Sequence, residues 1–383
     1  METLLRSVED NEGRVAADVA CRPRTFLICG IAGILLACLL TAWLIQHSRL
    51  SLLVMLAIVS LAVFIFLSLA LATKILVGHE LIINYHHEIA VLSGATLFLR
   101  LLHQPVLPYL DIFVLGLGVF LACGRIGCLL VGCCHGRPCR WGIIYHEHQA
   151  AAGFTPYYVG IPLFPVQALE SLFALVVVAF GIRMVLHGSL PGAAFTWYVI
   201  AYGFGRFCLE FLRGDPERPY LFGFSEAQWT SLILMSLTVS SELSRTLPMR
   251  PWHLGITLAL LFLMVAVTLH RRFRRTPTHR LLHPRHIREV ANALEYATTG
   301  QSWLKPEIPV GRTSLGIQIS SATRANSAPE LCAHYCLSRR DQPLTFEAAA
   351  ALAKIVCQLR HHPRHFHLLP GNNHVFHYIV GSS

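Results

Sequence analysis

The stretch Gly124-Arg125-Ile126-Gly127-Cys128-Leu129-Leu130-Val131-Gly132-Cys133-Cys134-His135-Gly136 follows the apolar run 110–123 and organises the chain. It places an arginine, three cysteines and a histidine where a bilayer makes charge expensive. An arginine in such a place is expected to have a functional role and to face a water-filled cavity or an anionic group. The alternative is an arginine near a helix end whose guanidinium extends to the headgroups. The glycines favour function, because Gly124, Gly127 and Gly136 leave a backbone that a helix or a ligand approaches closely.

The composition indicates a membrane protein. Of the 383 residues, 54% are hydrophobic and only 14% are charged, which excludes an ordinary soluble protein. A membrane-spanning helix needs about 20 apolar residues. The runs that reach or approach this length are residues 26–45, 52–72, 110–123, 166–186, 193–212 and 252–269. Two shorter runs, 89–102 and 229–239, are tilted spans, half-helices or re-entrant pieces. We predict an all-α polytopic membrane protein with seven or eight transmembrane helices, followed by a small C-terminal soluble α+β domain.

Three regions follow from these runs. Residues 1–24 form a polar lead-in that is amphipathic or disordered, and its acidic residues argue against a cleavable signal peptide. Residues 25–270 form the transmembrane domain, and residues 271–383 form a basic juxtamembrane segment with a small soluble domain of unknown role. The patterns in this tail predict helices over 286–298 and 345–360 and strands over 315–320, 333–337 and 375–380.

The net charge of +10 does not indicate nucleic-acid binding. Much of it lies in residues 271–275 and Arg280, immediately after the last apolar run. Juxtamembrane arginines attract anionic lipids and mark the cytoplasmic side, so we expect a cytoplasmic tail. No aromatic-interleaved basic platform accompanies the arginines, and we expect no nucleic-acid partner.

Titratable groups recur at the ends of the apolar runs. The polar insertion 78–88 contains His86 and His87, each of which is either a general base or an interfacial residue. Gln167 and Glu170 lie just inside a helix that begins near Pro165.

A later helix carries a second set of charges. Arg206, Glu210 and Arg213 are spaced i, i+4 and i+7, so a helix stacks them on one face. They form either a structural Arg206–Glu210 ion pair or a cationic face that meets Arg125 across a shared cavity.

The cysteines leave alternatives open. Cys128, Cys133, Cys134 and Cys139 are structural or disulfide-bonded, a metal centre, or a reactive thiol, and their spacing matches no recognised zinc or iron–sulfur pattern. In the tail, Cys332 and Cys336 and the six histidines between His361 and His377 are possible ligands, but they also match no closed zinc motif. We therefore predict no metal and no cofactor.

Three of these stretches resemble the bacterial prolipoprotein diacylglyceryl transferases in order and rough spacing. They are Gly124-Arg125-Ile126-Gly127 with Gly132 and Gly136, Pro165-Val166-Gln167 with Glu170, and Tyr202-Gly203-Phe204-Gly205-Arg206-Phe207 with Glu210 and Arg213. The similarity covers roughly residues 85–237. The chain departs from the family pattern at Cys128, where the family has asparagine, and in its extra apolar run 252–269 and soluble tail.

The resemblance implies an enzyme of the plasma (inner) membrane. It would transfer a diacylglyceryl group from phosphatidylglycerol to the thiol of a lipobox cysteine in a prolipoprotein signal peptide, with membrane lipids around it. His86 would be the base, Arg125 and Arg206 would hold the phosphate, and Tyr202 would hold a phosphate or ester oxygen. The implied substrate-binding residues are Gly124, Gly127, Gly136, Gln167, Glu170, Glu210 and Arg213. The alternatives are a related membrane transferase with another acceptor and a non-catalytic protein that binds or transports an anionic lipid.

Overall fold

The computed structural model describes residues 2–77, 84–151, 154–216, 219–273, 278–299, 308–325, 331–340, 342–361 and 366–380. Residues 78–83 of the predicted polar insertion, and His362 and His365 of the tail, lie outside this set. The α-helices are α1 (Glu2–His47), α2 (Leu52–Val77), α3 (Asn84–Leu101), α4 (Val106–Val131), α5 (Glu147–Ala151), α6 (Val166–Leu186), α7 (Ala193–Leu209), α8 (Glu226–Leu243), α9 (Pro251–Phe273), α10 (Thr278–Leu281), α11 (Pro284–Thr299) and α12 (Phe346–Leu359). The strands are β1 (Pro138–Ile143), β2 (Tyr220–Leu221), β3 (Phe224–Ser225), β4 (Val310–Arg312), β5 (Ile317–Ala325), β6 (Leu331–Arg339), β7 (His367–Pro370) and β8 (Phe376–Val380). Three short 3₁₀-helices are η1 (Pro156–Tyr158), η2 (Glu210–Leu212) and η3 (Asn372–His374).

The chain divides into two compact units. The first is a helical bundle made of Met1–His135, Pro165–Arg213 and Pro219–Ala266. The second combines Gly136–Phe164 and Gly214–Arg218 with Val267–Ser383. The second unit therefore gathers two loops of the transmembrane region together with the tail.

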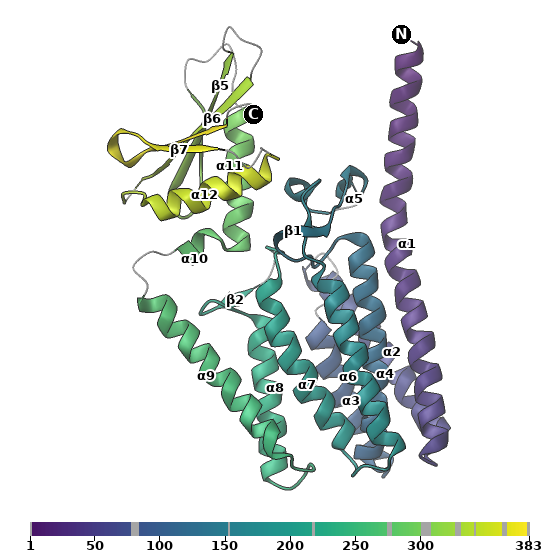
Figure 1. The fold of residues 1–383 in the computed structure, drawn as a ribbon. Coiled ribbons are helices and arrows are strands. Elements are labelled where there is room, and N and C mark those ends of the chain that lie inside the picture. The colour runs from purple at the N-terminus through teal and green to yellow at the C-terminus, as the bar shows by residue number, and fades with distance from the viewer. Residues whose placement is uncertain are drawn as a thin grey trace. The chain divides into compact units, whose positions relative to one another are not determined.

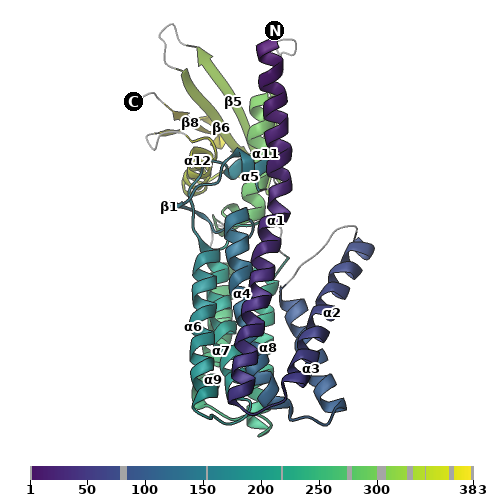
Figure 2. The ribbon, with the colours of Figure 1, turned by 90° about the vertical axis from the view of Figure 1, so that its right-hand side faces the viewer.

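Helix α4 is the central element of the bundle. It packs along α1, α6 and α7, and α6, α7 and α8 follow one another side by side (Figure 1). Figure 2 shows α1 running along α4, with α2 and α3 paired beside them. Gly127 allows the close approach of α1, because a Cβ atom at this position would lie 3.2 Å from the Cys29 Cβ and 3.3 Å from the Phe26 ring.

Five helices of the described residues are long and apolar enough to cross a membrane. These are residues Arg24–His47 of α1, Leu52–Leu76 of α2, and the helices α4, α6 and α9. Helices α3, α7 and α8 have 18, 17 and 18 residues, so each is about 25–27 Å long, but each falls short in length or in mean hydropathy. The prediction of a polytopic helical protein is confirmed at this coarser level.

The short connections of the bundle gather at one end. Residues 47–52, 101–106, 186–193 and 243–251 turn there (Figure 1, bottom). At this end the Asp111 carboxylate of α4 accepts hydrogen bonds of 2.7 Å from the backbone nitrogens of Gly192 and Phe195. It therefore satisfies backbone groups at the start of α7 that no turn of the helix can satisfy.

The second unit contains an antiparallel five-stranded sheet with the order β4-β5-β6-β8-β7. Alternate residues such as Ile319, Leu337 and Tyr378 are buried in a core that α11 and α12 complete with Val290, Leu294, Leu352 and Val356. The predicted α+β class, two helices and three strands of the tail are confirmed. The short edge strands β4 and β7 were not predicted, because three or four residues carry too little alternation.

Three sequence predictions need correction or refinement. The lead-in 1–24 is helical from Glu2, since α1 continues without a break to His47. The helix that contains the apolar run 110–123 continues past Arg125, because α4 extends to Val131. Arg213 does not share an α-helical face with Arg206, because α7 ends at Leu209 and the chain tightens into η2.

Candidate functional site: a buried arginine–glutamate cluster

The site is organised around Glu170, one turn into α6. Its side chain is completely buried, and its two oxygens face guanidinium groups from three segments. Arg125 Nε lies 3.1 Å from Oε2, Arg206 Nε lies 3.5 Å from Oε1, and Arg213 approaches Oε2 at 3.9 Å. A buried carboxylate is stable only when opposite charge and hydrogen bonds replace its water. Glu170 is therefore the group that holds three arginines in the bundle interior.

The second carboxylate of the cluster is Glu210. Its Oε2 lies 2.7 Å from Arg206 NH1, so the predicted ion pair one helical turn apart is present. Arg125, Arg206 and Arg213 are 4%, 3% and 1% exposed. These three guanidinium groups face the carboxylates of Glu170 and Glu210 directly, and Glu88 on α3 and the Cys134 thiol also interact electrostatically with Arg125. The Arg206–Glu210 ion pair of the sequence analysis is therefore present, and Arg206 and Arg125 meet at a shared carboxylate, Glu170.

Tyr202 connects the cluster to a cavity. Its buried hydroxyl donates a 2.8 Å hydrogen bond to Glu170 Oε1. The same side chain lines a cavity of about 470 Å³ between α3, α7 and α8. The cavity follows α3 from Tyr85 to Arg100, which is about 22 Å of helix, and Glu88 is among its lining residues. Its other walls combine leucine, valine and phenylalanine with tyrosine, serine and threonine side chains. A largely apolar cavity thus begins beside the arginine cluster.

His86 lies at the start of α3. Its side chain is 55% exposed, and Nε2 lies 2.6 Å from Oε1 of Glu226, at the start of α8. His87 instead points inward and packs its ring 4.6 Å from the ring of Phe66. Among the described residues, no hydrogen bond or ion pair joins His86 to Arg125. His86 is thus held by a carboxylate, outside the arginine cluster.

The cysteine loop begins where α4 ends. Gly132 has φ +86°, the left-handed conformation that terminates a helix and favours glycine. Cys128, Cys133 and Cys134 bring their sulfur atoms within 4.8 Å of one another. Gln167 on α6 holds this loop, because its Nε2 donates a 2.8 Å hydrogen bond to the Cys133 carbonyl. Cys139, the fourth cysteine of the predicted group, belongs to the second unit.

The predicted glycines have different surroundings. Gly124 faces open space, since no atom lies within 4 Å of where its Cβ would be. Gly127 is the close contact with α1. Gly136 donates a 3.1 Å hydrogen bond from its nitrogen to the Phe164 carbonyl, and a Cβ there would collide with that oxygen.

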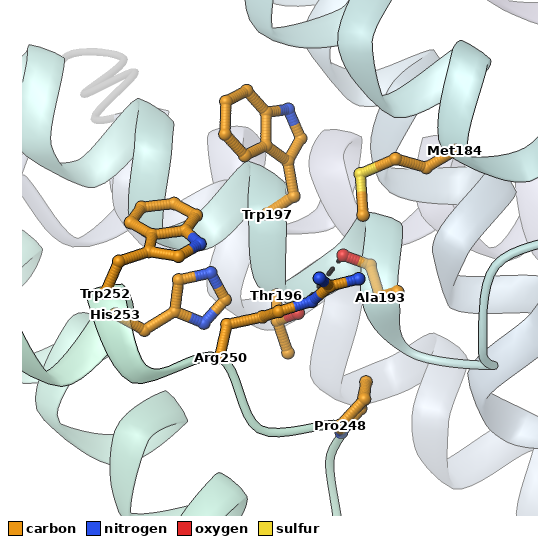
Figure 3. A pocket seen from close by; sticks show the side chains of 8 residues that line it. All are labelled: Met184, Ala193, Thr196, Trp197, Pro248, Arg250, Trp252 and His253. Carbon is orange, nitrogen blue, oxygen red and sulfur yellow. Dashed lines mark hydrogen bonds between the residues drawn. The ribbon is translucent and has the colours of Figure 1, made fainter.

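A second pocket lies at the other end of α6 and α7, where both helices meet α9 (Figure 3). Its volume is about 270 Å³, and Met184, Trp197, Arg250, Trp252 and His253 are among its lining residues. The rings of Trp197 and Trp252 meet edge to face at 5.8 Å.

The buried pair beside this pocket joins His253 and the α8 carboxylate Glu242. His253 Nδ1 lies 2.5 Å from Glu242 Oε1, and both side chains are 2% exposed.

Sequence reasoning missed two features of the site. It assigned Glu210 to Arg206 but did not identify Glu170 as the common partner, because 36 residues separate Glu170 from Arg206. It also missed Glu226 as the partner of His86. A sequence signal for this helix start exists, since Ser225 and Gln228 have the spacing of a capping box and Glu226 directly follows the N-cap residue.

The family model of prolipoprotein diacylglyceryl transferase matches residues 15–241 of this chain. A phosphatidylglycerol–prolipoprotein diacylglyceryl transferase of Clostridium tetani is 33% identical over 155 residues, which are 39% of this chain and 59% of the relative. A second such transferase, from Clostridium perfringens, is 38% identical over 117 residues, 29% of this chain and 42% of the relative. One from Dehalococcoides mccartyi is 33% identical over 148 residues, 38% of this chain and 54% of the relative.

The chain thus spans about half the length of the relatives it matches. No solved structure matches it significantly. The matched residues 15–241 include Glu170, its three arginines, Tyr202 and His86.

Proposed function

This chain belongs to the prolipoprotein diacylglyceryl transferase family, and we propose that it moves a diacylglyceryl group from phosphatidylglycerol to the thiol of a lipobox cysteine in a prolipoprotein. The observation that carries the proposal is the buried cluster of three arginines around Glu170, which lies beside a largely apolar cavity. A phospholipid presents the complementary pair of features, an anionic phosphate and long apolar chains.

The arginines supply the phosphate site. Arg125 and Arg206 each direct Nε toward Glu170, and Arg206 also pairs through NH1 with Glu210. The five N–H donors of a guanidinium allow it to bind phosphate oxygens as well as a carboxylate. A phosphodiester carries one negative charge that such arginines can bind. Arg213 and Glu210 hold this arrangement, and Tyr202 completes it with a hydroxyl next to the cavity.

The cavity between α3, α7 and α8 supplies the acyl-chain site. Its length of about 22 Å along α3 suits an extended fatty-acyl chain, whose apolar surroundings in the bilayer the cavity's apolar side chains can replace. Gly124 and Gln167 complete the substrate site at the headgroup end. Gln167 Oε1 is buried without a hydrogen-bond partner among the described residues, so it can accept from a glycerol hydroxyl. Gly127 and Gly136 contribute close backbone packing.

The reaction needs a thiolate and a stabilised leaving group. His86, oriented by Glu226, takes the proton of the lipobox thiol. The sulfur then attacks the glyceryl carbon that carries the phosphate, so that a C–S bond forms while the C–O bond to phosphate breaks. Glycerol phosphate leaves with the bonding electron pair, and Arg125 and Arg206 stabilise the charge that develops on it.

The topology follows as part of the proposal. We place the bundle in the plasma membrane as a multi-pass protein in which two or all three of the helices α3, α7 and α8 add to the five apolar spans, which makes seven or eight crossings. Residues 25–270 form this domain, residues 1–24 precede it, and the basic tail 271–383 lies in the cytoplasm.

The test measures transfer by the purified full-length protein. It is mixed with phosphatidylglycerol vesicles and a lipobox peptide, and mass spectrometry follows the peptide. The wild type is expected to add a diacylglyceryl mass to the cysteine and release glycerol phosphate in equal amount. Arg125→Ala is expected to lower the rate by about 10²–10³-fold, the usual loss when a group that stabilises a transition-state anion is removed. Arg183→Ala, an exposed arginine at the far end of α6, is the matched control and should react as the wild type does.

Three outcomes contradict the proposal in different ways. If the folded wild type binds phosphatidylglycerol but does not modify the peptide, the chain is a lipid-binding protein and not a transferase. Lipid mass on another acceptor in a membrane extract indicates a transferase of different specificity. Equal rates for Arg125→Ala and wild type remove the phosphate role of the cluster.

A further inference from the structure

Two histidines and a cysteine converge on one face of the C-terminal sheet. Register places Cys336 of β6 opposite His377 of β8, and His334 lies two residues before Cys336. Side chains alternate along a strand, so these three share a face. Their neighbours Tyr335, Leu337 and Tyr378 point to the opposite face and are buried in the core. The cluster therefore lies on the face of the sheet away from that core.

The donor atoms are spaced as a metal requires. His334 Nε2 lies 3.0 Å from His377 Nδ1, and the Cys336 sulfur lies 3.7 Å from the former and 3.4 Å from the latter. In tetrahedral zinc, with bonds of about 2.0 Å to nitrogen and 2.3 Å to sulfur, ligand atoms lie about 3.3 Å (N to N) and 3.6 Å (N to S) apart. The three observed distances match three corners of that tetrahedron within about 0.3 Å, close to the tolerance for a metal site.

The surroundings support the ligands. The Ser320 hydroxyl, opposite Cys336 on β5, forms a hydrogen bond with the cysteine side chain. Gly371 provides room for the His377 ring, because a Cβ there would lie 2.5 Å from Nε2. Partners of this kind fix the orientation of metal ligands. All three ligand residues are partly exposed, so solvent reaches the position that they leave open.

A hydrogen bond between the two imidazoles is the simpler account of this cluster. It explains the 3.0 Å distance, with one ring donating and the other accepting. It does not explain why a thiol lies within 3.7 Å of both nitrogens, since a neutral imidazole pair needs no third partner. A cation that three donors share explains all three distances at once.

We propose that His334, Cys336 and His377 bind one zinc ion on the open face of the C-terminal sheet, with water as the fourth ligand. Imidazole and thiolate are the donors that zinc prefers, and three protein ligands with one solvent position describe an exchangeable site rather than a closed structural one. The sequence predicted no metal here because strand pairing, not local spacing, brings His377 to Cys336. This inference does not depend on the proposed lipid chemistry.

The test titrates the reduced full-length protein in detergent with Co²⁺ and then with Zn²⁺. One equivalent of Co²⁺ is expected to give the near-ultraviolet charge-transfer band of a cobalt–thiolate bond and the visible bands of tetrahedral cobalt. Zn²⁺ should displace it in equal amount. Cys336→Ser should abolish the charge-transfer band, and loss of a ligand should weaken zinc binding by more than about 100-fold. His377→Gln, which leaves the thiol in place, should weaken it similarly.

Two matched controls locate the ion. Ser338→Ala alters the same face of the same strand without touching a ligand and should bind as the wild type does. Cys134→Ser alters the other cysteine cluster of the chain and should also leave the spectrum unchanged. A band that survives Cys336→Ser but disappears in Cys134→Ser places the metal at the α4 loop and overturns the proposal. The proposal is also overturned if neither Co²⁺ nor Zn²⁺ changes the melting temperature or the spectrum of the wild type.

Discussion

The two ends of helices α6, α7 and α8 each bury a carboxylate, but in different company. At one end Glu170 faces three arginines and a tyrosine hydroxyl. At the other end Glu242 faces a single imidazole, that of His253. A one-to-one pair needs nothing more, whereas guanidinium groups that converge from three segments can also bind a further anion. The comparison teaches that a buried charge alone does not mark a site, but a convergence of several arginines does.

The largest expected effect is that of Glu170→Gln. This change leaves three buried guanidinium groups with one carboxylate, and an uncompensated buried charge costs about 3–5 kcal/mol. We expect most of the protein to be lost from the folded, detergent-soluble fraction, measured by size-exclusion chromatography and thermal unfolding. Glutamine keeps the shape, so the loss reports charge. A variant as stable as the wild type would show that Glu170 is not the organising group.

A smaller effect is expected from Arg125→Lys. Lysine keeps the positive charge but lacks the planar fork that contacts Glu170 and phosphate oxygens together. The protein should stay folded, and we expect the rate of diacylglyceryl transfer to fall by about 10–100-fold, which corresponds to one or two hydrogen bonds to a charged group. Rates are measured with the peptide assay above. If Arg125→Lys transfers at the wild-type rate, a positive charge at residue 125 is sufficient for transfer and the planar guanidinium is not required.

The variant Glu226→Gln tests the role of His86 as a base independently of phosphate binding by the arginines. Without the carboxylate at 2.6 Å, His86 loses the group that orients it, and we expect transfer to fall by about 10-fold with unchanged affinity for phosphatidylglycerol. Raising the pH of the assay should restore part of the rate, because the acceptor thiol then ionises without help. A variant that loses lipid affinity instead would assign Glu226 to the phosphate site.

The smallest effect is expected from Glu242→Gln, at the opposite end. An amide still accepts a hydrogen bond from His253, so we expect a loss of only about 1 kcal/mol of stability. Transfer per folded molecule should equal that of the wild type. If the rate falls more than a few-fold, the two ends are coupled and the comparison between them fails.

The sequence predicted the fold in outline because long apolar runs report membrane helices directly. It also identified Arg125, Glu170 and Arg206 individually, since charge is rare in such runs. It did not predict that Glu170 joins them, because this contact depends on how α4, α6 and α7 pack. The convergence of His334, Cys336 and His377 was not predicted for the same reason, as β-strand register brings together Cys336 and His377, which are 41 residues apart. His86 keeps its predicted role as a proposal.

Asp111 has a consequence for how the bundle assembles. The first turn of α7 has backbone nitrogens that lipid cannot satisfy, and the carboxylate that accepts from them lies 81 residues earlier in the chain, on α4. Because α4 precedes α7 in the chain, the acceptor is synthesised before the backbone nitrogens that need it. A loss of the Asp111 carboxylate would therefore leave the first turn of α7 without an acceptor that its own helix cannot replace.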